Sequence, residues 1–177
     1  MRSARPGRCA RRLTLAVGLL GCVVQMHAAL AVAPPPIVGK DAPDFVAKTI
    51  DGSNLRLSEF RGQVVLVNFW ARWASDSRQE MPALSRINQT YERAGLKVIG
   101  ISIDDDLVRA RAFADAMKLS YPVMLDAGPQ IGRDYQLGKM PMTILVDRSG
   151  VIRYAHVGYR RGDDRVFLDH IRELLRE

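Results

Sequence analysis

The chain has 177 residues, of which 47% are hydrophobic and 25% charged, enough for one globular domain and a short additional segment. Its net charge of +7 belongs mainly to the first 31 residues: five of the 26 basic residues lie there, all 19 acidic residues follow, and the remainder carries a net charge of +2. Since the remainder also has no basic stripe interleaved with aromatics, the composition excludes nucleic-acid binding as the main function.

The first 31 residues have the pattern of a secretory signal peptide. An arginine-rich start precedes an apolar run from Leu13 to Met26, and Ala29 and Ala31 match an A-x-A cleavage site. The run is short for a transmembrane anchor, which needs about 20 residues. Leu19 to Cys22 also resembles a lipobox, in which Cys22 would be lipidated and provide the only attachment to a membrane. Both alternatives predict an exported protein in the periplasm or cell envelope.

The two cysteines of the chain, Cys9 and Cys22, both lie in this leader. Cleavage after Ala31 would leave no thiol, no disulfide and no thiolate ligand for a metal. Lipidation would block the thiol of Cys22 as well. The mature chain is therefore predicted to have no sulfur nucleophile.

Residues 32–37 form a proline-rich linker, and the folded domain is expected over 38–177. Asp51-Gly52 predicts a turn between strands at 45–50 and 54–57. The apolar run 64–70 predicts a central strand buried on both faces. A helix should follow from about Ser75 to Ala94, interrupted by Pro82 and ended by Gly95.

The second half continues to alternate between strands and helices. Strands are predicted at 96–104, 122–125, 142–147 and 151–157, the last two as an antiparallel hairpin, and helices at 107–119, 129–135 and 163–176. The order predicts an α/β fold with a mixed central sheet and helices on both faces.

The stretch Val67 to Pro82, with the letters VNFWARWASDSRQEMP, resembles the active-site segment of TlpA/ResA-like thioredoxins. That family has N-F-W-A-x-W, then C-x-x-C, then x-x-E-x-P, and only the two cysteines are missing. Similar motifs at 98–104 and 138–150 extend the resemblance over essentially the whole mature chain. The resemblance implies a thioredoxin fold with an N-terminal β-hairpin and a TlpA-type βα insertion.

The resemblance places the attacking cysteine at Ala74 and the resolving cysteine at Ser77. A methyl group has no lone pair, and a serine hydroxyl does not take part in thiol–disulfide exchange. A serine nucleophile at Ser77 has no nearby histidine in the sequence, so Ser75 or Ser77 is interpreted as the helix cap, with Ser77 and Glu80 forming a capping box. Pro141 resembles the family's cis-proline, beside which client peptides bind.

The predicted peptide-binding groove contains Trp73, Ala74, Ser77, Glu80, Met140 and Pro141. Two alternatives stay open for Glu80, a buried glutamate that tunes proton transfer in the family or a capping residue at the helix surface. Trp70 and Trp73 are expected to lie in the core or to line the groove. The acids at 104–106 are expected to cap the next helix rather than bind a metal, and the scattered methionines to pack in the core rather than bind copper. No cofactor is predicted.

Two functions compete on this sequence. The first is a non-catalytic binding or adaptor module for envelope or secreted polypeptides, with cytochrome-maturation or redox proteins among the candidate partners. The second is the thiol:disulfide oxidoreductase activity of the family, retained only through thiols that a partner supplies. The residues Ala74 and Ser77 favour the first.

Overall fold

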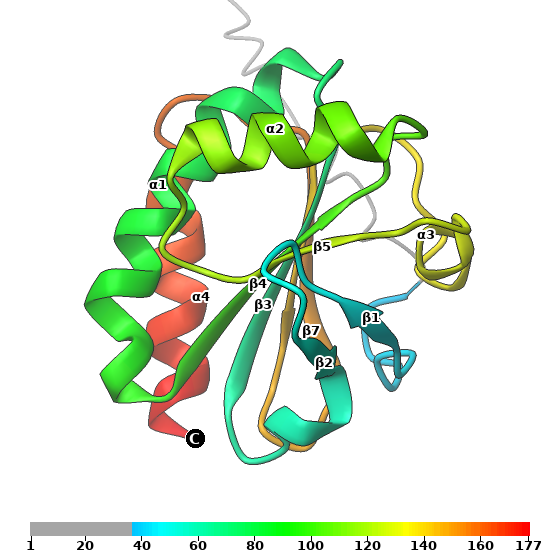
Figure 1. Cartoon of the computed structure of the whole chain (residues 1–177). Helices are drawn as coiled ribbons and strands as arrows, with labels where there is room; N and C mark the ends of the chain where they lie inside the picture. Colours follow the sequence, from blue (N-terminus) through cyan, green and yellow to red (C-terminus); the bar gives the residue numbers. More distant parts are fainter. Residues whose placement is uncertain (1–36) are drawn as a thin grey trace, which may run out of the picture. The chain divides into compact units, whose positions relative to one another are not determined.

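A computed structural model describes residues 37–177, and at its centre lies a mixed five-stranded sheet in the order β5-β4-β3-β6-β7 (Figure 1). The strands of this sheet are β3 (Val64–Trp70), β4 (Leu96–Ser102), β5 (Val123–Leu125), β6 (Met142–Val146) and β7 (Ile152–Val157). The helices are α1 (Ser75–Tyr91), α2 (Leu107–Met117), α3 (Gln130–Asp134) and α4 (Asp164–Arg176). All of these elements were predicted, with bounds that differ by a few residues.

The central strand β3 is buried along its whole length, as its unbroken apolar sequence predicts. It runs parallel to β4, with Val67 opposite Ile99, and antiparallel to β6, with Asn68 opposite Thr143. The end of β3 therefore lies inside the sheet, between two paired strands. The segment after Trp70 leaves the sheet at the carboxyl end of β3, and the candidate site lies there.

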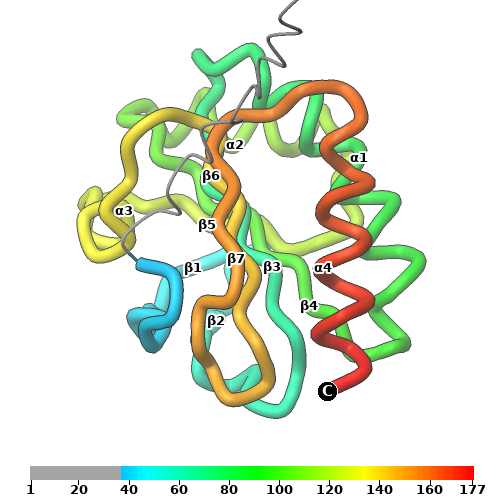
Figure 2. The backbone as a smooth tube through the Cα atoms, turned by 180° about the vertical axis from the view of Figure 1, so that it is seen from behind, coloured from blue at the N-terminus to red at the C-terminus, as the bar shows by residue number. Residues whose placement is uncertain are grey.

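The two faces of the sheet carry separate cores. Helices α1 and α4 lie side by side over one face, whereas α3 lies on the opposite side (Figures 1 and 2). Leu84 of α1, Ala110 of α2 and Ile171 of α4 belong to the core of the first face. Ile131 of α3 belongs to the second core, together with residues from the N-terminal part of the domain. The predicted mixed sheet with helices on both faces is confirmed.

The predicted N-terminal hairpin is present as a separate two-stranded sheet. Strands β1 (Val46–Lys48) and β2 (Asn54–Arg56) pair antiparallel, and Gly52 in the turn has a φ of 95°, which favours glycine. The predicted antiparallel pairing of β6 with β7 is also present. A βα unit, β5–α3, lies between α2 and β6, in keeping with the expected TlpA-type insertion.

One expectation about local structure was wrong. Helix α1 is continuous through Pro82. A proline removes one helical hydrogen bond, and burial of the flanking Met81, Ala83 and Leu84 against the core outweighs that loss. Ile37, the last residue of the predicted linker, is only 3% exposed and belongs to the core.

The predicted signal peptide at 1–31, the lipobox-like sequence at Cys22 and the linker residues up to Pro36 lie outside the described residues. Within residues 37–177, no helix is long and apolar enough to cross a membrane.

Candidate functional site

The start of helix α1 forms the centre of the candidate site. The chain leaves β3 at Trp70, makes a short turn, and enters the helix with Ala74 as the N-cap residue. No side chain caps this end, so the predicted capping by Ser75 or Ser77 and the capping box with Glu80 were wrong. The reason is geometric: Ser77 and Glu80 lie on the face of the helix that is turned into the core, and both are 0% exposed. Asp76 lies in the first turn, where its charge is favourable for the helix dipole.

The two positions that hold cysteines in the resembled family are both largely covered. Ala74 is 9% exposed and Ser77 is fully buried. The hydroxyl Oγ of Ser77 lies 3.5 Å from the backbone nitrogen of Ala71, from which it accepts a long hydrogen bond. Within residues 37–177, no histidine forms a hydrogen bond with the Ser77 hydroxyl. The hydroxyl thus has a structural partner, the backbone of Ala71, and no histidine among the described residues to activate it.

Directly below this helix end lies a buried carboxyl group. Glu80 Oε1 accepts a hydrogen bond of 2.7 Å from the Thr143 hydroxyl, and Oε2 accepts one of 2.8 Å from Asn68 Nδ2. Asn68 Nδ2 also donates to Thr143 Oγ1 at 2.9 Å, which closes the triangle. Burial raises the pKa of Glu80 to about 7, against the effect of its two hydrogen bonds, and the nearby Asp163 and Asp76 add to the rise. Of the two alternatives for Glu80, a buried glutamate or a capping residue at the helix surface, the structure shows the buried glutamate.

An open cleft lies above the helix end, beside the position of the first missing cysteine. Its volume is about 390 Å³ and its lining residues are Trp73, Ala74, Ser75, Asp76, Gly138, Lys139 and Met140. The side chain of Trp73 is 66% exposed, which is unusual for so large an apolar residue. Across the cleft, the Met140–Pro141 peptide bond is cis, as the resemblance implies.

A second cleft of about 250 Å³ continues from the first, because both are lined by Asp76 and Lys139. It extends along the loop after β7, past Gly158 and Arg160. The two neighbouring clefts are lined by the exposed ring of Trp73 at one end and, further along, by two cationic side chains, Lys139 and Arg160, and two carboxylates, Asp76 and Asp163.

The structure thus separates the six residues of the predicted groove into two layers. Trp73, Ala74 and Met140 line the cleft. Ser77, Glu80 and Pro141 are buried and lie outside its lining. Of the first group, only Trp73 is widely exposed, since Ala74 is 9% and Met140 4% exposed, so Trp73 offers the main contact for a bound polypeptide.

Two residues of the buried triangle were missed in the sequence. Asn68 is the single polar side chain in the apolar run of β3, and Thr143 stands opposite it on β6. The amide of Asn68 in the middle of an apolar strand could have indicated a buried polar cluster, because a buried amide needs hydrogen-bonding partners.

The other candidate ligand groups have structural roles. Asp106 caps α2 by accepting a hydrogen bond from the backbone nitrogen of Arg109, as predicted. The buried Asp104 accepts hydrogen bonds from the backbone nitrogen of Arg72 and from the hydroxyl of Ser102. Within residues 37–177, no three histidine, cysteine or acidic side chains are grouped so that they could hold a metal ion.

Comparisons with known proteins agree with this architecture. Residues 38–155 match the model of the AhpC/TSA family. The thioredoxin-like protein YneN of Bacillus subtilis is 38% identical over 122 residues, which cover 68% of this chain and 71% of YneN. The thiol-disulfide oxidoreductase ResA of Geobacillus kaustophilus is 30% identical over 127 residues, 72% of this chain and 73% of ResA.

Solved structures give the same result. A protein described as a thiol:disulfide interchange protein DsbE, from Chlorobium tepidum, superimposes with a TM-score of 0.75 at 30% identity and covers 78% of this chain and 97% of its own. A protein described as a protein disulfide isomerase, from Bacteroides thetaiotaomicron, has a TM-score of 0.72 at 32% identity, with 79% and 91% covered. The chain belongs to the AhpC/TSA family and is a TlpA/ResA-like redoxin with the thioredoxin fold of the thiol-disulfide oxidoreductases.

Proposed function

We propose that this redoxin is a non-catalytic binding module for extended polypeptides of the cell envelope. The observation that carries the proposal is the combination at the start of α1: an open cleft with an exposed Trp73 lies beside Ala74, where the family chemistry would need a thiolate. The binding surface and the redox chemistry of the family are separable, because the first depends on shape and the second on sulfur.

The arrangement around Ser77 supports the absence of turnover. Thiol–disulfide exchange needs two sulfurs in succession, one to attack and one to release the mixed disulfide. The Ser77 hydroxyl is buried and accepts a hydrogen bond from the backbone nitrogen of Ala71, and no histidine among the described residues is hydrogen-bonded to it. Glu80 beneath it has the raised pKa of a proton-transfer group but no thiol to serve.

Affinity for polypeptides is attributed to the cleft. Exposed tryptophan side chains are frequent anchors of protein interfaces, because they bury a large apolar area at a small entropic penalty. The cleft continues past Lys139, so a chain of several residues fits along it in an extended form. The localisation in the envelope, and with it the class of client, rests on the predicted leader.

The binding test is to titrate a fluorescently labelled, unfolded polypeptide with the protein and measure fluorescence anisotropy. The Trp73→Ala variant should weaken binding by about tenfold, the usual effect of removing an aromatic anchor. Val108→Ala is the matched control, since Val108 is an 81% exposed apolar residue on α2, outside both clefts. Equal binding by the Trp73→Ala and wild-type proteins would contradict the assignment of the cleft.

The catalytic test is reduction of insulin disulfides with dithiothreitol as the electron donor, measured as the rate above that of dithiothreitol alone. The full chain with Cys9→Ser and Cys22→Ser contains no thiol and should not catalyse the reaction. Adding Ala74→Cys and Ser77→Cys together should produce reductase activity, because the helix end and the buried Glu80 are already in place.

Single variants control this experiment. Ala74→Cys alone should form mixed disulfides with clients and fail to release them, which also provides a covalent trap for identifying the clients. Ser77→Cys alone should be inert, because that position is fully buried. Steady turnover by the thiol-free chain alone would sink the proposal.

A further inference from the structure

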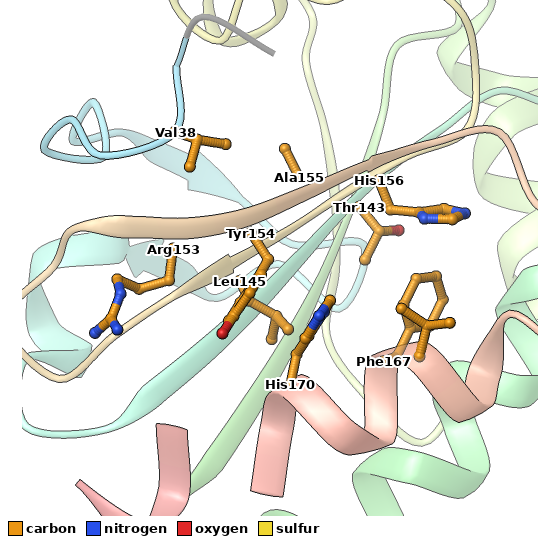
Figure 3. A pocket seen from close by; sticks show the side chains of 10 residues that line it. Val38, Thr143, Leu145, Arg153, Tyr154, Ala155, His156, Phe167 and His170 are labelled. Atoms are coloured by element: carbon orange, nitrogen blue, oxygen red, sulfur yellow. The ribbon is translucent and has the colours of Figure 1, made fainter. Parts of the chain in front are cut away.

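A partly enclosed cavity of about 120 Å³ lies between strand β7 and helix α4 (Figure 3). Leu145 and Thr143 of β6 contribute to its lining, as do Val166 of α4 and Val38 of the segment before β1. The cavity has no lining residue in common with the cleft at Trp73. It shares only His156 with the second cleft, and the polypeptide-binding proposal does not use the cavity itself.

Four aromatic rings line this cavity in two pairs. Tyr154 and His170 are stacked, with ring centroids 3.7 Å apart and planes inclined by 5°. His156 and Phe167 form an edge-to-face pair at 5.2 Å and 85°. Figure 3 shows the first pair and the second on different sides of the cavity. Such walls favour a planar ring, which can pack against faces and edges at once.

Most polar groups at the cavity already have partners. His156 Nε2 lies 3.1 Å from Asp163 Oδ2, and the Thr143 hydroxyl donates to Glu80. The guanidinium of Arg153 is paired with Asp147 and Glu177.

His170 differs from these groups. Its ring is partly exposed and stacks on Tyr154, and no hydrogen bond within residues 37–177 involves its nitrogens. Burial lowers the pKa of His170, so the ring is neutral at pH 7 and offers one donor and one acceptor. The His170 ring can therefore form a hydrogen bond with a ligand in this cavity.

We propose that the cavity binds a small single-ring aromatic compound that carries one hydroxyl group, such as a phenol. The volume fits one ring: a cavity of about 150 Å³ in another protein takes up benzene, while a single water needs only about 10–15 Å³ on the same scale. The ring packs between the two aromatic pairs, and the hydroxyl group forms a hydrogen bond with His170. A purely apolar ring of the same size fills the space but leaves His170 without that bond.

The experiment is a titration of the full-length protein with phenol and, separately, with benzene, followed by changes in amide NMR signals. Phenol should cause saturable shifts at β7 and the first turns of α4, with a dissociation constant in roughly the millimolar range. Benzene should bind about tenfold more weakly, which is the effect of one hydrogen bond. No saturable shift at these residues, or equal affinity for both compounds, would overturn the proposal.

Two variants test the location. Val166→Trp should obstruct the cavity and abolish phenol binding, whereas Val108→Trp, the same change at an exposed valine of α2, should leave it unchanged. His170→Phe keeps a ring beside Tyr154 and removes the nitrogens, so it should weaken phenol about tenfold and leave benzene unaffected. If Val166→Trp does not fold, the His170→Phe comparison decides alone. Unchanged phenol binding in either variant refutes the site.

Discussion

The buried Glu80 makes the stability of this fold depend on pH in a way that one substitution should remove. In the folded chain its pKa lies near 7, whereas the ordinary value, expected after unfolding, is 4.5. Between these two pH values the unfolded chain releases a proton that the folded chain keeps, so the free energy of unfolding falls as pH rises. Above about pH 7 the loss is complete, because the carboxylate is then ionised in both states.

The magnitude follows from the two pKa values. Each pKa unit corresponds to about 1.36 kcal/mol, so a rise from 4.5 to about 7 amounts to about 3 kcal/mol. Glu80→Gln keeps the size of the side chain and an amide that can hydrogen-bond with Asn68 and Thr143, but it cannot ionise. We expect this variant to equal the wild type within about 1 kcal/mol at pH 4.5 and to exceed it by about 3 kcal/mol at pH 8.

The assay is urea denaturation of both proteins at several pH values between 4 and 8.5, followed by circular dichroism. The difference between the two proteins isolates Glu80, because other groups with shifted pKa values, such as His170, are common to both. Glu92→Gln is the control: Glu92 is exposed at the end of the same helix, and its replacement should change the free energy of unfolding by less than about 0.5 kcal/mol. A stability difference between Glu80→Gln and wild type that stays constant across this pH range would refute the reasoning.

Two further predictions concern the frame that holds the site. Gly100→Ala should destabilise the protein by about 1–3 kcal/mol in the same urea assay, because its new Cβ would lie 2.9 Å from the ring of the buried Tyr121. The control is Gly128→Ala, which has nothing within 4 Å of its Cβ and should change stability by less than about 0.5 kcal/mol. Equal effects of the two substitutions would show that the close contact is unimportant. Asp106→Ala should lower stability by about 1 kcal/mol through loss of the α2 cap, and full stability of this variant would contradict the capping role.

The fold was predictable because its strongest signals are local. The run 64–70 could bury seven successive side chains only in the middle of a sheet covered on both faces, and β3 has these bounds. The continuous helix at Pro82 was not predictable from local sequence. At that position the helix is stabilised by the burial of Met81 and Leu84 in the core, and such tertiary contacts cannot be read from the local sequence.

The start of helix α1 was predictable, whereas the direction in which its side chains point was not. The spacing of Trp73, Ala74 and Ser77 located the helix start, but a one-dimensional motif does not say which residues point outward. Ser77 looked like a cap, and its hydroxyl instead faces the interior near the nitrogen of Ala71. The triangle around Glu80 joins residues from three elements, and its Thr143 lies 63 positions further along the chain, beyond the reach of pattern reading.

The position of β3 in the sheet also has a consequence for how the molecule acquires its shape. Asn68 pairs with Thr143, 75 positions later, so growth from the N-terminus exposes one of the most apolar segments long before its second neighbour exists. Contacts this distant in sequence slow folding, and an unpaired strand of this composition is prone to association with other chains. In the newly made polypeptide, β3 therefore stays exposed to such association until β6 has been synthesised.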